Sequence, residues 1–252
     1  MDVDIYAWER KIEMIRLISV ILFFSVFFIV TIPVDIVLVI MRKYNRNLSD
    51  RISRHFIRWT FRCILAISGT KIEARGMENI PKDQAVLYVG NHNSYYDIIS
   101  SYTLLPGPTG YVAKKEMVKY PFLSWWMIFI DCIFIDRKNI KEGLKAILAG
   151  VDQIKSGVSM FVFPEGTRSK NGEMAPFKEG SMKMATKSDA PIVPVAFTNT
   201  RSIWEAQTPK IKSSNIIIEF GKPIIISELS KEEQKHLGVY TQNRIKEMLE
   251  NA

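Results

Sequence analysis

A long apolar run near the N-terminus constrains this chain more than any other feature of its sequence. Residues 17–34 read LISVILFFSVFFIVTIPV without a charge, and the run resumes after Asp35 as far as Met41. A helix that spans a bilayer needs about 20 apolar residues, so the run predicts a membrane-embedded segment. Pro33 and Asp35 together predict a break within it. Two arrangements remain open: one kinked spanning helix, or two helices bent into a hairpin that dips into one leaflet.

A basic segment follows the apolar run directly. Residues 42–75 contain nine Lys or Arg residues and only two acidic ones, so most of the formal net charge of +8 lies here. Within a helix predicted over residues 48–68, four arginines share one narrow stripe: Arg51, Arg54, Arg58 and Arg62. This pattern is typical of an interfacial helix on anionic lipid, and a solvated face of a helix packed on the domain has it too. Because the segment adjoins an apolar run and lacks a nucleic-acid motif, we expect a phospholipid surface as its partner and no nucleic acid.

The rest of the chain predicts one folded domain. Strand-like runs alternate with helix-like stretches such as residues 141–155, which is typical of an α/β domain with helices covering a mixed sheet. We therefore place a membrane anchor at residues 1–70 and the α/β domain at residues 71–252. The two cysteines, Cys63 and Cys132, lie far apart without the spacing of metal ligands, so we expect neither a disulfide nor a metal site.

The first candidate site follows a predicted strand. Residues 85–90 form a short apolar run, and the sequence then reads NHNSYYD over residues 91–97. On a regular helix His92 and Asp97 would lie roughly 140° apart, so they meet only if His92 is on a loop and Asp97 is near the start of a helix. A paired imidazole takes a proton from a hydroxyl, while the carboxylate fixes its tautomer. A histidine at a strand end that has no such carboxylate partner is more often structural than catalytic.

The second candidate site follows another predicted strand, residues 159–163. Its loop reads PEGTRS over residues 164–169. Gly166 allows a tight turn, Arg168 offers a planar fork to a phosphate or carboxylate, and Glu165 is suited to receive an ammonium or a hydroxyl. No Gly-x-Ser-x-Gly motif nominates a protein serine, so the substrate's own hydroxyl is the expected nucleophile, and the expected reaction is acyl transfer.

Together these runs resemble the 1-acyl-sn-glycerol-3-phosphate acyltransferase family. Four blocks match in chain order: residues 91–97, residues 112–137, residues 163–169 and residues 192–195. The resemblance implies that His92 is the general base and that Asp97 orients it. It also implies a set of substrate-binding residues, which are Lys114, Arg137, Glu165, Gly166, Thr167 and Arg168. Ser124 stands where the family usually has glycine, which leaves the acyl chain length open.

The resemblance also implies the reaction and its setting. We expect transfer of a fatty acyl group from acyl-CoA or acyl carrier protein to the hydroxyl of lysophosphatidic acid, with no bound cofactor and no metal. The expected location is the cytoplasmic face of the inner (plasma) membrane, where the family's N-terminal helices favour the dipping hairpin. Another lysophospholipid or glycerol 3-phosphate is an alternative acceptor. A noncatalytic lipid-binding protein is the alternative of another class.

Overall fold

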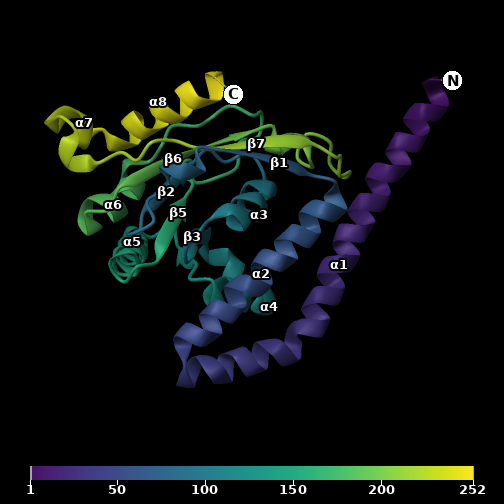
Figure 1. The fold of residues 1–252 in the computed structure, drawn as a ribbon, viewed down its shortest axis with the longest axis horizontal. Coiled ribbons are helices and arrows are strands. Elements are labelled where there is room, and N and C mark those ends of the chain that lie inside the picture. The colour runs from purple at the N-terminus through teal and green to yellow at the C-terminus, as the bar shows by residue number, and fades with distance from the viewer. Residues whose placement is uncertain (1, 252) are drawn as a thin grey trace. The chain divides into compact units, whose positions relative to one another are not determined.

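The apolar N-terminal run forms one helix, α1 (Asp2–Tyr44), in the computed structural model (Figure 1). The structure describes residues 2–251 of the chain and the side chains of residues 8–251. α1 continues through Pro33 and Figure 1 shows it bent along its course, so the apolar run forms one bent helix, as in the first of the two predicted arrangements, and not two helices. A proline removes one intrahelical hydrogen bond, which an apolar helix tolerates when the turns on both sides stay paired. By length and composition alone, the stretch Trp8–Tyr44 is sufficient to cross a membrane.

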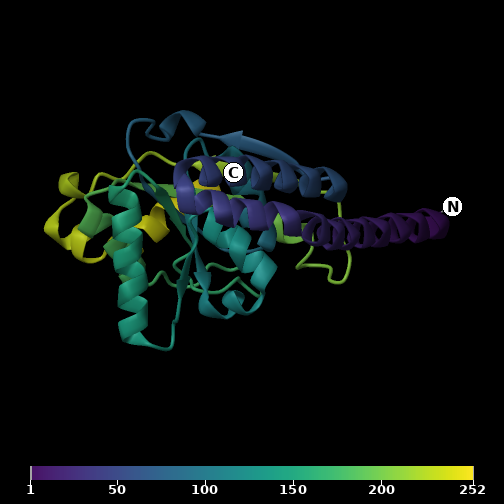
Figure 2. The same cartoon turned by 90° about the horizontal axis from the view of Figure 1, so that it is seen from below.

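The second helix, α2 (Arg46–Ser68), runs back beside α1, and together they form a hairpin (Figures 1 and 2). The turn lies at Asn45, whose side-chain oxygen accepts a hydrogen bond from the Leu48 N–H at 3.0 Å and caps α2. Arg42 and Asp50 form an ion pair at 3.0 Å beside this turn. The chain therefore reverses after the apolar run, between α1 and α2, and not within the run.

The outer face of α2 is both basic and apolar. The helix predicted over residues 48–68 is confirmed, and Arg51 and Arg62 are exposed along it. On the same helix the side chains of Trp59 and Ile52 are 54% and 40% exposed. A helix with exposed cations and exposed large apolar groups has the features of an interfacial helix.

Contacts divide the chain into two units. The first unit consists of Met1–Glu73, Ser94–Thr103 and Asn199–Ile216, and it contains α1, α2 and α3 up to Thr103. All remaining residues form the second unit, which holds most of the sheet. The predicted domain boundary at residue 70 stays a prediction.

The sheet is mixed, as predicted, with seven strands in the order β1-β7-β6-β2-β5-β3-β4. Their bounds are β1 Lys71–Arg75, β2 Leu87–Gly90, β3 Thr109–Lys114, β4 Ile133–Ile135, β5 Ser159–Val162, β6 Ile192–Thr198 and β7 Asn215–Phe220. The five strands from β2 to β6 run parallel, and β7 is antiparallel to β6. Because parallel strands end at the same edge, the loops after β2 and β5 lie next to each other.

Helices cover the sheet, and one face of it carries the main apolar core. The helices after α2 are α3 Tyr95–Leu104, α4 Pro121–Phe129, α5 Ile140–Lys155, α6 Lys183–Ser188, α7 Lys231–Lys235 and α8 Leu237–Glu250. Leu87 of β2 and Met160 of β5 are fully buried on this face. They pack in one cluster with Ile154 of α5, Met184 of α6 and Ile245 of α8. Burial of such side chains contributes on the order of 1.5–3 kcal/mol each, so this core holds the edge with the candidate site in place.

Candidate active site

Asn91 anchors the loop that follows β2. Its side-chain N–H donates to the Phe197 carbonyl at 3.1 Å, and its side-chain oxygen accepts from the Phe197 N–H at 2.8 Å. Asn91 is buried and Phe197 belongs to β6, so the two hydrogen bonds fix the chain direction where the loop begins.

His92 lies on this loop, as predicted, and its backbone is held on both sides. Its N–H donates to Glu165 Oε1 at 2.6 Å, and its carbonyl accepts from the Ser169 N–H at 2.8 Å. The imidazole stacks on the ring of Phe163, with the ring centroids 4.0 Å apart and an interplanar angle of 17°. The segment after β5 therefore fixes both the backbone of His92 and one face of its ring.

Glu165 is buried, and both of its carboxylate oxygens bind backbone groups. Oε1 accepts from the His92 N–H at 2.6 Å, and Oε2 accepts from the Ala175 N–H at 2.8 Å. A carboxylate that accepts from two backbone donors is a strong clamp in a buried setting. The geometry thus makes Glu165 a positioning residue for His92, and its predicted role in substrate binding stays a prediction.

Asp97 lies in the first turn of α3, as predicted, and is fully buried. One of its oxygens, Oδ2, accepts from the Ser94 N–H at 2.8 Å, which closes the turn that opens the helix. Asp97 belongs to the first unit and His92 to the second. The pairing of the two side chains stays a prediction.

Glu205 is a residue of this region that the sequence did not reveal. Its Oε2 accepts from the Ser94 hydroxyl at 2.6 Å, and its Oε1 accepts from the Tyr95 N–H at 2.9 Å. The ring of the neighbouring Trp204 lies 5.6 Å from that of Tyr95, centroid to centroid. One acidic side chain more than a hundred positions downstream therefore holds the start of α3, and no local pattern marks it.

Replacing Glu205 with alanine should destabilise the protein. The change leaves the hydroxyl of the buried Ser94 without its acceptor, at a cost of roughly 1–3 kcal/mol, and it removes the exposed hydrogen bond from the Tyr95 N–H. Thermal unfolding in detergent should show a lower Tm for Glu205→Ala. The exposed Glu228 supplies the control, and equal Tm values for Glu205→Ala and Glu228→Ala would refute the anchoring role.

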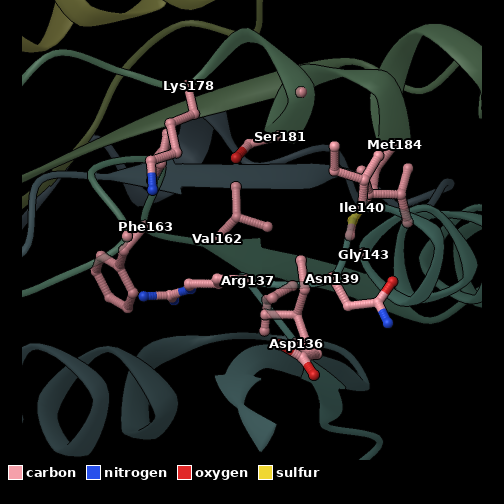
Figure 3. A pocket seen from close by; sticks show the side chains of 16 residues that line it. Asp136, Arg137, Asn139, Ile140, Gly143, Val162, Phe163, Lys178, Ser181 and Met184 are labelled. Atoms are coloured by element: carbon pink, nitrogen blue, oxygen red, sulfur yellow. The ribbon is translucent and has the colours of Figure 1, made fainter.

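Two of the predicted binding residues line a cavity beside Phe163. Arg137 and Gly166 line it, together with Lys178 and Phe163 (Figure 3). In Figure 3 the cationic side chains lie at the Phe163 end, and Ile140 and Met184 lie toward the opposite end, where Asn139 also lies. Because Phe163 also stacks on the imidazole of His92, the cavity is adjacent to the expected base.

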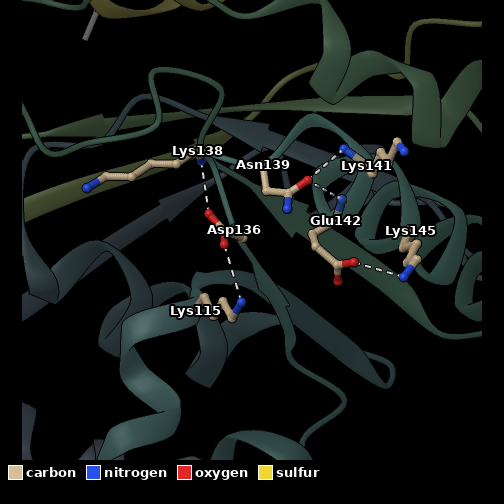
Figure 4. Close-up of polar contacts among 7 residues, drawn as sticks. All are labelled: Lys115, Asp136, Lys138, Asn139, Lys141, Glu142 and Lys145. Carbon is tan, nitrogen blue, oxygen red and sulfur yellow. Dashed lines mark hydrogen bonds and ion pairs between the residues drawn. The ribbon is translucent and has the colours of Figure 1, made fainter.

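The turn between β4 and α5 presents Arg137 to this cavity. Asp136 Oδ1 accepts from the Lys138 N–H at 3.0 Å, and Asp136 Oδ2 forms an ion pair with Lys115 Nζ at 3.3 Å (Figure 4). These contacts hold the pKa of Asp136 below its usual range, first through the Lys138 N–H and then through Lys115. The Asn139 side chain caps α5 at the end of the turn by accepting from the Lys141 N–H at 3.0 Å.

The other predicted binding residues do not line the cavity. Lys114 is exposed at the end of β3, and Thr167 and Arg168 follow Gly166 along the loop. Lys178 lines the cavity, although it was not among the predicted binding residues. In the sequence it is only one cation that follows the loop of residues 164–169. Within residues 8–251, no group of three or more His, Cys, Asp or Glu side chains is arranged to hold a metal ion.

The chain is similar to known acyltransferases. The Acyltransferase family profile matches residues 71–198, about half of the chain. A 1-acyl-sn-glycerol-3-phosphate acyltransferase of Borreliella burgdorferi is 30% identical over 200 residues, which cover 79% of this chain and 80% of that protein. An enzyme of the same name from Saccharomyces cerevisiae is 31% identical over 187 residues, 71% of this chain and 61% of that one.

The fold has a solved counterpart. The crystal structure of the 1-acyl-sn-glycerophosphate (LPA) acyltransferase PlsC from Thermotoga maritima superposes with a TM-score of 0.81. The match covers 96% of this chain and 97% of that chain, at 24% sequence identity. At this identity the likeness concerns the fold, and it confirms the predicted glycerolipid acyltransferase-like α/β architecture.

Proposed function

Because this chain belongs to the 1-acyl-sn-glycerol-3-phosphate acyltransferase family, we propose that it transfers a fatty acyl group from an acyl thioester to the hydroxyl of lysophosphatidic acid. The product is phosphatidic acid, and the donor is acyl-CoA or acyl carrier protein. One observation carries the proposal: the imidazole of His92 stacks on Phe163, and Phe163 lines the cavity that contains Arg137. A base beside a cation-lined cavity suits an acceptor with both a hydroxyl and a phosphate.

The proposed step needs no bound cofactor. The imidazole of His92 takes the proton of the acceptor hydroxyl while that oxygen attacks the thioester carbonyl. A carbon–oxygen bond forms, the carbon–sulfur bond breaks, and the sulfur leaves as a thiol after it takes up the proton. Asp97, by the family resemblance, holds the imidazole in the reactive tautomer and stabilises the imidazolium.

Cys132 does not support a mechanism with a protein nucleophile. Burial raises the pKa of the Cys132 thiol to about 12, so the thiol stays protonated at neutral pH. The thiolate is the nucleophilic form of cysteine, so a raised pKa argues against Cys132 as a nucleophile. The proposal is therefore direct attack by the acceptor hydroxyl.

The binding of the acceptor follows from the residues around the cavity. We assign Arg137 and Gly166 to the phosphate, since both line the cavity beside Phe163. By the family resemblance alone, Lys114, Thr167 and Arg168 provide further contacts.

The membrane is the proposed working surface. α1 is the one helix among the described residues that is long and apolar enough to cross a bilayer, and α2 exposes Trp59 beside cations. We place the hairpin in the cytoplasmic face of the inner (plasma) membrane, with its basic residues at anionic headgroups. A high-salt wash should leave the protein in the membrane fraction, and only detergent should release it. Release by salt alone would contradict an embedded hairpin.

An acceptor panel tests the function. Detergent-purified protein is incubated with an acyl thioester and one acceptor at a time, and released thiol and lipid product are both measured. Lysophosphatidic acid should react fastest, with one thiol released per phosphatidic acid formed. A higher kcat/KM with glycerol 3-phosphate or with another lysophospholipid would reassign the acceptor. No transfer to any acceptor would favour the noncatalytic alternative.

A further inference from the structure

The segment that follows β3 exposes a cluster of large apolar side chains. It consists of the 3-10 helix Lys115–Lys119 and of α4, and both belong to the second unit. Five side chains in this segment are between 37% and 61% exposed, and we call them the α4 patch: Val118, Tyr120, Phe122, Trp125 and Ile128. Single exposed apolar residues are ordinary, but a cluster of them marks an interaction surface.

The aromatic side chains of α4 form two sets with opposite exposure. Trp126 and Phe129 are buried, with their ring centroids 5.8 Å apart. Phe122 and Trp125 form a second edge-to-face pair, also with centroids 5.8 Å apart, and this pair is exposed to solvent. The buried pair is enough to fix the helix to the protein, so the exposed pair is available for a partner.

Local contacts hold the patch in a defined position. The Ser124 N–H donates to the Tyr120 carbonyl at 2.8 Å where α4 begins, and the Cys132 N–H donates to the Met127 carbonyl at 2.9 Å just after it ends. The ion pair of Lys115 ties the preceding 3-10 helix to the turn between β4 and α5 (Figure 4). The patch is therefore a fixed surface and not the tip of a loose loop.

The segment with the patch starts at the edge of the sheet that carries the candidate active site. β3 runs parallel to β5, and β5 runs parallel to β2, so the carboxyl ends of all three strands lie at one edge. His92 follows β2, Glu165 follows β5, and the segment with the patch follows β3.

The composition of the segment is typical of a membrane–water interface. Lys115 and Lys119 are exposed next to the patch, and Glu116 is the one acidic residue within residues 114–130. Tyrosine and tryptophan are enriched where a protein crosses from apolar to polar surroundings. Lysines near an anionic leaflet each contribute about 1 kcal/mol of attraction. An anionic lipid surface therefore complements the patch in both polarity and charge.

We infer that the α4 patch is a second membrane-binding surface, which enters the headgroup region of an anionic phospholipid leaflet. The inference goes beyond acyl transfer and beyond the hairpin of α1 and α2, because it states how the unit that contains the sheet meets the membrane. Phe122, Trp125 and Ile128 reach the boundary of the acyl chains, and Lys119 contacts the headgroups. This contact brings the sheet edge with His92 to the lipid surface.

Fluorescence quenching on the full-length protein tests the inference. Both native cysteines are replaced by alanine, and one reporter cysteine at a time is labelled with an environment-sensitive fluorophore. Trp125→Cys and Ile128→Cys report on the patch, and each is a test if the other misfolds. Lys187→Cys on α6 is the exposed control, and Ile52→Cys on α2 reports separately on the hairpin. The labelled proteins are bound to vesicles of phosphatidylcholine and phosphatidylglycerol in equal parts.

The expected result is protection of the patch by lipid. Nitroxide groups on the lipid chains should quench the labels at positions 125 and 128 at least about threefold more than the label at position 187, since interfacial side chains lie roughly 5–10 Å inside the headgroup boundary. Iodide in the water should quench the labels in the opposite order. Vesicles of phosphatidylcholine alone should give weaker lipid quenching at position 125, because they lack anionic headgroups for the lysines.

Three results would overturn the inference. The first is iodide quenching at positions 125 and 128 equal to that at position 187, on vesicles whose lipid quenches the label at position 52. The second is protection of the patch only after acyl carrier protein is added, which would assign the patch to a carrier protein. The third is self-quenching between labelled copies without quenching by lipid, which would assign it to a second copy of the chain.

Discussion

Replacing His92 with alanine should lower kcat by at least ~10²-fold, because the acceptor hydroxyl then loses the base that takes its proton. The KM for lysophosphatidic acid should change little, since the phosphate is assigned to Arg137 and Gly166 and not to His92. The measurement is steady-state release of thiol, with product quantified in parallel.

The control for this prediction is a histidine elsewhere in the chain. His236 is exposed between α7 and α8, and it forms an i,i+4 contact with Glu232 at 3.2 Å. His236→Ala should keep the wild-type kcat. Activity retained in His92→Ala would remove the histidine from the mechanism altogether.

Replacing Glu165 should produce the second large loss. Alanine at this position leaves the N–H groups of His92 and Ala175 without acceptors in a buried place, at a cost of roughly 1–3 kcal/mol for each unpaired group. Glutamine restores only one acceptor, because its amide has one oxygen and a donor group where the second oxygen was. We expect kcat to fall about 10²-fold in Glu165→Ala, with a lower Tm and an unchanged KM, because the change displaces the base and not the substrate.

The comparison variant for Glu165 lies on the same loop. Glu173 is exposed and accepts from the Asn171 side chain at 2.7 Å, so Glu173→Ala should keep both kcat and Tm close to wild type. If Glu165→Ala instead raised the KM for the acceptor at constant kcat, Glu165 would be a substrate contact, as the family resemblance implies, and not a clamp.

Much of the fold was predictable from apolar runs with clear ends. The runs at residues 85–90 and 159–163 became β2 and β5, because each is short, buried and followed by polar turn residues. β1 (Lys71–Arg75) was not predicted: three of its five residues are charged, and it lies at the edge of the sheet, where burial leaves little trace in the sequence.

The course of the N-terminal helices was only partly predictable. Pro33 and Asp35 suggested a break that left open one kinked helix or two helices; the turns on both sides of Pro33 stay helical, and the chain reverses at Asn45. Asn45 is a good N-cap residue, but an asparagine between Tyr44 and Arg46 has no apolar pattern around it to signal a turn. Proline position alone is therefore a poor guide to where an apolar helix ends.

The site was predictable as far as neighbouring residues define it. His92 on its loop and Asp97 at the helix start followed from the strand–loop–helix order. Glu205 was not predictable, because it binds Ser94, which is distant in sequence. Lys178 was not predictable, because only the folded chain brings it close to Gly166. The clamp made by Glu165 was equally hidden, since its partners are backbone N–H groups, which any residue supplies.

The central claim is that the acyl group passes directly from the thioester to the acceptor hydroxyl. The most direct test is rapid-mixing measurement of thiol release, with an enzyme concentration high enough to see a single turnover, in the presence and absence of lysophosphatidic acid. Direct transfer predicts no thiol above background without the acceptor, and one thiol per phosphatidic acid with it. A burst of one thiol per protein without acceptor, with the acyl group recovered on the chain, would contradict the account.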